Sequence, residues 1–259
     1  MLALVGLCFV TGLLIGSFLN VVIWRVPRGD SVVRPPSHCP GCDRPIRPRD
    51  NVPVVSWLLL RGRCRDCGTG ISIRYPAVEV ATAVVFGVLA WRFGFDGALP
   101  AFLYLGAIGV ALTMIDIDVH RLPNAIVLPS YVVAAVLLTV PAAATGEWSQ
   151  LLRAALGGLV LFAFYFALAF VYPAGMGFGD VKLAGVLGIY LGWLGWGVLL
   201  IGGFLGFLLG GVVGGALMVV RRAGRKSKIP FGPFMLVGAL IAILTGQRIF
   251  DGYLNLMGI

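Results

Sequence analysis

Four of the five cysteines form two closely spaced pairs. Cys39 and Cys42 make the first pair and Cys64 and Cys67 the second, giving a C-x2-C-x21-C-x2-C spacing. Two such pairs present four thiolates from two tight turns, which is a tetrahedral ligand set for zinc. Because four protein ligands leave no open coordination position, we expect a structural Zn²⁺ ion rather than a catalytic one. His38 adjoins the first pair and could replace a cysteine, but four cysteines suffice.

Two aspartates stand at the edges of long apolar runs, where a carboxylate is costly to desolvate. Asp116 ends one run, and Asp180 lies in the loop at residues 173–182 before another. Asp116 and Asp118 are about 200° apart on a helix, so only one can face a bundle interior, and we expect the deeper Asp116 to do so. Two neighbouring carboxylates share a proton, which suits aspartyl proteolysis: one activates water and the other protonates the substrate. The alternative is a proton or cation relay in a transporter.

Glu79 is the other acid near an apolar boundary on the same side. It follows Pro76 by three residues, so it lies early in a helix, where the helix N-terminus stabilises a carboxylate. A purely dipole-satisfying role and a functional role both remain open for it. Gly177 and Gly179 flank Phe178 beside Asp180, and we expect them to leave room for a substrate backbone.

The composition places all these residues in a membrane protein. Hydrophobic residues make up 59% of the 259 residues and charged residues 12%, with a mean hydropathy of +0.97. A soluble domain of this size could not cover such a chain with polar surface. We therefore expect an all-α polytopic membrane protein. Its eight predicted spans are 2–24, 77–93, 98–115, 124–142, 152–172, 181–196, 198–220 and 231–247.

The basic residues set the expected orientation. With eight alternating spans, 17 of the 20 lysines and arginines fall on one side of the membrane. The positive-inside rule makes that side cytoplasmic and places both termini outside. The two aspartates, Glu79 and the cysteine pairs then all lie at or near the cytoplasmic face.

Residues 25–76 are the one sizeable hydrophilic segment, between the first two spans. The segment is too small and polar to bury a core of its own, so the metal should fold it. A net charge of +9 could indicate nucleic acid, but Trp57 and Tyr75 are too few aromatics for a stacking platform. The lipid bilayer surface explains the arginines more simply.

In its motifs and their order, the sequence resembles the bacterial type IV prepilin peptidase family, the leader peptidase/N-methyltransferases. The resemblance covers nearly the whole chain and rests on the four cysteines and five motifs. These motifs are residues 16–22, 74–79, 116–123, 177–182 and 230–234.

The resemblance implies an enzyme of the bacterial inner membrane that cleaves the leader of type IV prepilins and type II secretion pseudopilins on the cytoplasmic face. It implies that the new N-terminal residue is then methylated with S-adenosylmethionine. Asp116 and Asp180 match the proteolytic aspartates, while Glu79 matches the region associated with methyl transfer. The implied division is a first helix at 1–24, a zinc loop at 25–76 within a methyltransferase-associated region at 1–79, and a seven-helix peptidase core at 77–259. No glycine-rich motif marks the residues that contact the methyl donor, and the oligomeric state is left open.

Overall fold

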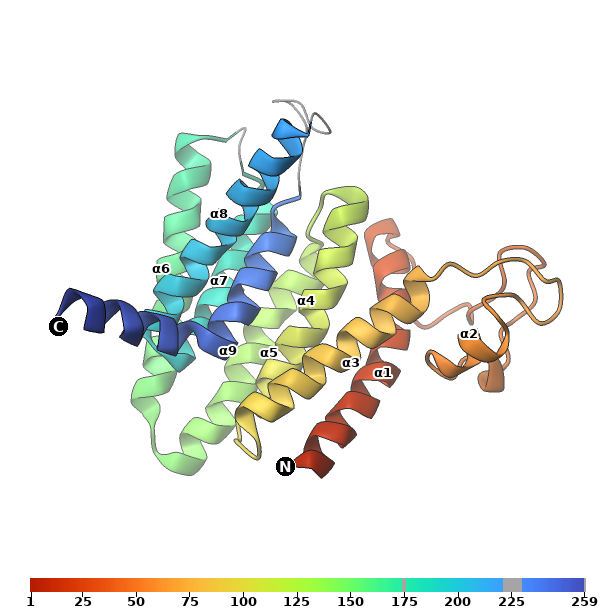
Figure 1. Cartoon of the computed structure of the whole chain (residues 1–259), viewed down its shortest axis with the longest axis horizontal. Helices are drawn as coiled ribbons and strands as arrows, with labels where there is room; N and C mark the ends of the chain where they lie inside the picture. Colours follow the sequence, from red (N-terminus) through yellow and green to blue (C-terminus); the bar gives the residue numbers. More distant parts are fainter. Residues whose placement is uncertain (174–175, 221–229, 259) are drawn as a thin grey trace. The chain divides into compact units, whose positions relative to one another are not determined.

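The computed structural model describes residues 1–173, 176–220 and 230–258, and their regular structure is helical apart from two isolated bridges (Figure 1). The all-α prediction is therefore confirmed for the described residues. The α-helices are α1 (Leu2–Arg25), α2 (Val55–Leu59), α3 (Arg74–Phe93), α4 (Leu99–Val119), α5 (Asn124–Thr145), α6 (Trp148–Val171), α7 (Phe178–Leu194), α8 (Trp196–Val219) and α9 (Gly232–Met257). Two short 3₁₀ helices, η1 (Val26–Arg28) and η2 (Pro48–Asp50), lie between α1 and α2.

Seven helices in the described part of the chain are long and apolar enough to cross a membrane: α1, α3, α4, α5, α6, α8 and α9. These match seven of the eight predicted spans. The remaining one, predicted at 181–196, is the 17-residue helix α7. At 1.5 Å per residue it is about 25 Å long, shorter than a typical hydrocarbon core.

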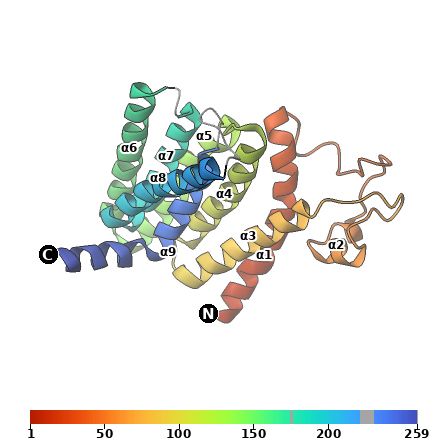
Figure 2. The ribbon, with the colours of Figure 1, turned by 45° about the horizontal axis from the view of Figure 1, so that its top comes forward.

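The chain divides into two compact units, Met1–Ala111 and Leu112–Ile259. In the first unit, α1 and α3 lie side by side, as Figures 1 and 2 both show. Glycines on α1 allow this approach, because a Cβ atom at Gly12 would lie 2.6 Å from the Cα of Ala83. The amide of Asn20 donates to the carbonyl oxygen of Tyr75 at 3.2 Å, which satisfies a polar side chain within an apolar helix.

In the second unit, α7 packs against α5, α6, α8 and α9 (Figure 1). Nearly every residue from Val181 to Trp193 is buried, so α7 is apolar on all sides and lies at the centre of its unit. Arg153 of α6 donates to the carbonyl oxygens of Gly192 and Trp193, both at 2.8 Å. A cation thus satisfies the C-terminal carbonyls of a buried helix.

Candidate functional site

The four paired cysteines come together in the loop between α1 and α3. Their sulfur atoms all lie within 4.8 Å of one another, and the Sγ atoms of Cys39 and Cys67 are 3.7 Å apart. Four sulfur donors at this spacing could hold a metal ion with tetrahedral geometry. Hydrogen bonds with the side chain and backbone of Thr69 lower the pKa of the Cys67 thiol to about 6, which favours the thiolate that binds metals.

The two knuckles have the same backbone geometry. In each, the first cysteine donates its N–H to the carbonyl five residues later, at 2.9 Å for Cys39 and 2.8 Å for Cys64. Its own carbonyl accepts the N–H four residues later, at 2.8 and 2.9 Å respectively. The residue after the second cysteine is left-handed in both, with φ of +57° at Asp43 and +72° at Gly68. Two copies of one turn therefore present the four sulfurs.

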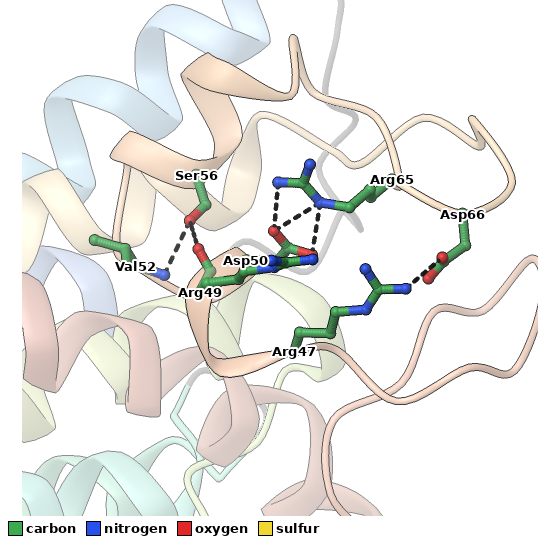
Figure 3. Close-up of polar contacts among 7 residues, drawn as sticks. All are labelled: Arg47, Arg49, Asp50, Val52, Ser56, Arg65 and Asp66. Carbon is green, nitrogen blue, oxygen red and sulfur yellow. Dashed lines mark hydrogen bonds and ion pairs between the residues drawn. The ribbon is translucent and has the colours of Figure 1, made fainter.

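Ion pairs join the second knuckle to the segment between the knuckles (Figure 3). Arg65 donates to both carboxylate oxygens of Asp50, with its closest contact at 2.7 Å, and Arg47 contacts Asp66 at 2.9 Å. In one ion pair the second knuckle supplies the arginine, and in the other it supplies the aspartate. The segment between the knuckles supplies the partner in each case. Hydrogen bonding to Arg65, together with its charge, lowers the pKa of Asp50. The sequence signal for these ion pairs is the Arg65-Asp66 dipeptide inside the knuckle, whose arginine was counted above only as a positive charge.

Glu79 lies within the first unit, where it joins the loop to the helices. Its side chain is buried, with 7% of the residue exposed, and its Oε2 accepts the N–H of Val54 at 2.7 Å. Ser17 of α1 also forms a hydrogen bond with this carboxylate. Gly16 permits the approach, since a Cβ there would lie 2.7 Å from the Cα of Glu79. Glu79 therefore meets the 16–22 motif, and its carboxylate contacts the chain just before α2.

Asp116 lies near the end of α4 in the second unit and is 5% exposed, whereas Asp118 is exposed. The facing predicted from the helical period is thus observed. The Oδ2 of Asp116 accepts the backbone N–H of Gly232, at 3.0 Å, from the first turn of α9. A Cβ at Gly232 would lie 2.8 Å from that oxygen, so glycine is required for the close approach.

Asp180 lies in the first turn of α7. Its Oδ2 accepts the N–H of Gly177 at 3.1 Å, as an acid does at the third helical position. The atoms nearest to a Cβ at Gly179 belong to Leu122, with the closest at 3.1 Å. On the side where a Cβ would lie, Gly179 therefore packs against the turn after α4, and room for a substrate backbone beside the two glycines stays a prediction.

The segments that carry the two aspartates meet within the second unit. Leu122, in the turn after Asp116, packs against the position of Gly179, next to Asp180, and against that of Gly232, whose N–H bonds to Asp116. The ammonium group of Lys182 donates to the side-chain oxygen of Asn124 at the start of α5, and it lies 5.0 Å from the ring centre of Phe178. The segments at 116–124, 177–182 and 231–232 thus converge within one unit. The Pro230–Phe234 motif joins this site through the backbone hydrogen bond from Gly232 to Asp116, which the sequence did not predict.

Two family models match the chain in succession. The bacterial peptidase A24 N-terminal domain matches residues 10–93, and the type IV leader peptidase family matches residues 101–219. A prepilin leader peptidase/N-methyltransferase of Stutzerimonas stutzeri is 36% identical over 278 residues, covering 98% of this chain and 95% of that protein. The chain belongs to the type IV leader peptidase family.

Other relatives of the same description support this assignment. The protein from Pseudomonas aeruginosa is 35% identical, with 99% of this chain and 96% of that protein covered. The protein from Neisseria gonorrhoeae is 38% identical over 73% of this chain and 74% of its own length. No solved structure matches the chain. The resemblance predicted from the motifs is confirmed.

The matched regions of this leader peptidase family member separate the two groups of candidate residues. The N-terminal model covers the four cysteines and Glu79, while the leader peptidase model covers Asp116 and Asp180. The residues missed in the sequence are those that contact these groups through the backbone, Val54 and Gly232. The only sequence signal for either contact was Gly232 itself, which stands between Phe231 and Pro233 at the start of a helix.

Proposed function

We propose that this chain is a membrane aspartyl endopeptidase that removes the leader of type IV prepilins and type II secretion pseudopilins and then methylates the new N-terminus. Family membership supports the reaction class, and curated relatives carry the description prepilin leader peptidase/N-methyltransferase. The observation that carries the proteolytic assignment is the convergence, within one unit, of the segments that bear Asp116 and Asp180, which meet at Leu122.

Asp116 and Asp180 each have one oxygen fixed by a backbone N–H, from Gly232 and Gly177 respectively. We assign the chemistry to the two Oδ1 atoms. One carboxylate accepts a proton from water, whose oxygen attacks the scissile carbonyl carbon, and the other, protonated, donates to the carbonyl oxygen. Cleavage of the C–N bond then transfers a proton to the leaving amine, which becomes the N-terminus of the mature pilin.

The four cysteines, Cys39, Cys42, Cys64 and Cys67, fit a structural Zn²⁺ ion because their sulfurs form a complete four-ligand set. S-Adenosylmethionine supplies an electrophilic methyl group for the freed amine. The buried carboxylate of Glu79 accepts from Val54, which supports a structural role for this residue rather than a direct contact with the donor. We assign Glu79 to positioning within the region at 1–79, and the peptidase core to 77–259.

We place the site at the cytoplasmic face of the bacterial inner membrane. The support is the charge distribution, with 17 of 20 basic residues on the side that carries Asp116 and Asp180 in the alternating eight-span arrangement. A prepilin with a basic leader and an apolar helix would present its cleavage point at that depth.

The test is mass spectrometry of a prepilin co-expressed with each variant in cells that lack their own peptidase. Asp116→Asn and Asp180→Asn should leave the leader attached, while the exposed, matched Asp118→Asn should cut as the unmodified enzyme does. Normal cleavage by Asp116→Asn with loss in Asp118→Asn would refute the choice of pair. Proton flux in proteoliposomes without cleavage would favour the transporter alternative.

A further inference from the structure

The short helix α2 has two unlike faces. On one face Ser56 is buried. Its hydroxyl oxygen accepts from the N–H of Val52 at 3.0 Å, and its hydroxyl donates to the carbonyl oxygen of Arg49 at 3.1 Å. Trp57, also on this face, donates from Nε1 to the carbonyl oxygen of Ile71 at 3.0 Å. The other face consists of Val55, Leu58 and Leu59, which are 50%, 61% and 77% exposed. The face that packs on the loop is thus partly polar, and the exposed face is wholly apolar.

The hydrogen bond from Val54 to Glu79 fixes the position of α2 along helices α1 and α3. Val54, directly before α2, is bonded to Glu79, and the Cα of Glu79 lies at the level of Gly16 on α1. Gly16 is nine residues before Arg25, the last residue of α1, which corresponds to about 13 Å along the helix. Figures 1 and 2 show α2 beside α1 and α3 rather than beyond the Arg25 end. The start of α2 is therefore level with an apolar part of α1.

The charges around α2 suit an anionic surface. Residues 25–76 contain ten arginines and four aspartates. Arg49 precedes α2, and Arg61 and Arg63 follow it, and all three are exposed. Basic residues flanking an exposed apolar face are typical of helices that lie in the headgroup region of a bilayer.

We propose that α2 is an interfacial helix that immerses Val55, Leu58 and Leu59 in the membrane, with Arg49, Arg61 and Arg63 at anionic headgroups. The occupant of the exposed face is lipid, which surrounds α1 and α3 at this depth in any membrane-embedded form of the chain. The bond between Val54 and Glu79 holds the metal-binding loop flat against the bilayer. This role does not depend on either enzymatic activity.

The test places the photo-crosslinking residue p-benzoylphenylalanine at Leu58 or at Leu59 in the full-length protein. The protein is reconstituted in phosphatidylcholine vesicles with or without phosphatidylglycerol. The matched control position is Asp43, whose side chain is 94% exposed in the first knuckle. After illumination, mass spectrometry should find lipid adducts at Leu58 and Leu59 several-fold above those at Asp43, with phosphatidylglycerol over-represented.

Three outcomes would overturn the proposal. Crosslinked dimers would make the face an interface between copies, and adducts within one chain would make it a packing surface for another segment. Lipid labelling no greater than at Asp43 would place α2 in water. Because Leu58 and Leu59 point out of the fold, either probe should leave the metal content unchanged, and that content verifies an intact loop for each variant.

Discussion

Asp116 receives a hydrogen bond that depends on the absence of a side chain at Gly232. An alanine Cβ at this position would lie 2.8 Å from Oδ2 of Asp116, well inside contact distance. Gly232→Ala should therefore displace the carboxylate and lower the rate of prepilin cleavage by about ten- to a hundredfold, as small misplacements of catalytic groups do. The rate is measured with a purified prepilin in detergent or proteoliposomes.

Gly252→Ala provides a matched control on the same helix, because no atom lies within 4 Å of a Cβ added there. Alanine is a better helix former than glycine, so neither substitution should weaken α9 through backbone propensity. Equal cleavage rates for the two variants would show that the contact between Gly232 and Asp116 does not position the carboxylate.

The residues around this contact also show what a sequence can reveal at this scale. The choice of Asp116 over Asp118 followed from the helical period and the cost of burial, which are local properties. The contact with Gly232 joins residues 116 positions apart and depends on how α4 and α9 pack. The bond from Val54 to Glu79 needs φ of +60° at a β-branched residue, a conformation that no local preference would predict.

The arrangement of the two knuckles should depend on the Zn²⁺ ion that we propose for them. Cys64→Ser removes one of four sulfurs and replaces it with a hydroxyl, which is a poor zinc ligand. Bound zinc, measured by inductively coupled plasma mass spectrometry, should fall from one equivalent to nearly none. Helical content measured by circular dichroism should change little, since the helical structure between residues 29 and 73 is limited to η2 and α2.

Cys8→Ala serves as the control for loss of a thiol. Cys8 is a buried residue of α1 and lies outside the cysteine cluster. This variant should keep its full zinc content. Zinc retained by Cys64→Ser would mean that another residue, with His38 the nearest candidate in sequence, completes the site.

The ion pair of Arg65 and Asp50 should slow the release of metal from the loop. Since Arg65 lowers the pKa of Asp50, the stabilisation is present at neutral pH and is lost as pH falls through the lowered folded-state pKa. Asp50→Asn should speed zinc transfer to a chromogenic chelator by about two- to fivefold at neutral pH, the range expected for a partly exposed ion pair. The difference from the unmodified protein should vanish in acid, once Asp50 of the unmodified protein is protonated and has lost its charge.

Asp43→Asn makes the same chemical change at a side chain that is 94% exposed. Asparagine also tolerates the left-handed backbone at this position, where φ is +57°. Its release rate should match that of the unmodified protein, and an equal acceleration in both variants would attribute the effect to net charge alone.

Helix α7 shows why the ends of a helix are harder to predict from sequence than its presence. Hydropathy identified an apolar segment at 181–196, but the structure begins the helix at Phe178 and so includes Asp180 in its first turn. The N–H of Gly177 bonded to the Asp180 carboxylate allows that earlier start, and hydropathy does not register a capping interaction. Its burial on all sides follows from packing against four helices, which no pattern within one helix reports.

At the scale of the whole molecule, the two groups of functional residues fall in separate compact units. The cysteines and Glu79 lie within Met1–Ala111, and Asp116 and Asp180 lie within Leu112–Ile259. The family models divide the chain in the same order, with their boundary between residues 93 and 101. Each reaction should therefore be removable by a substitution in one unit without loss of the other.

Asp180→Asn and Glu79→Ala test this separation in opposite directions. Asp180→Asn should abolish leader cleavage but methylate a pre-cleaved pilin at the unmodified rate. Glu79→Ala leaves the N–H of Val54 without its acceptor in a buried site, which should release α2 from α3 and lower the methylation rate about tenfold or more while cleavage persists. Glu79→Gln retains a neutral acceptor of the same shape and should recover part of that loss. If Glu79→Ala lowers both rates equally, while zinc content and helical content stay normal, the two activities share one site and the separation by unit is wrong.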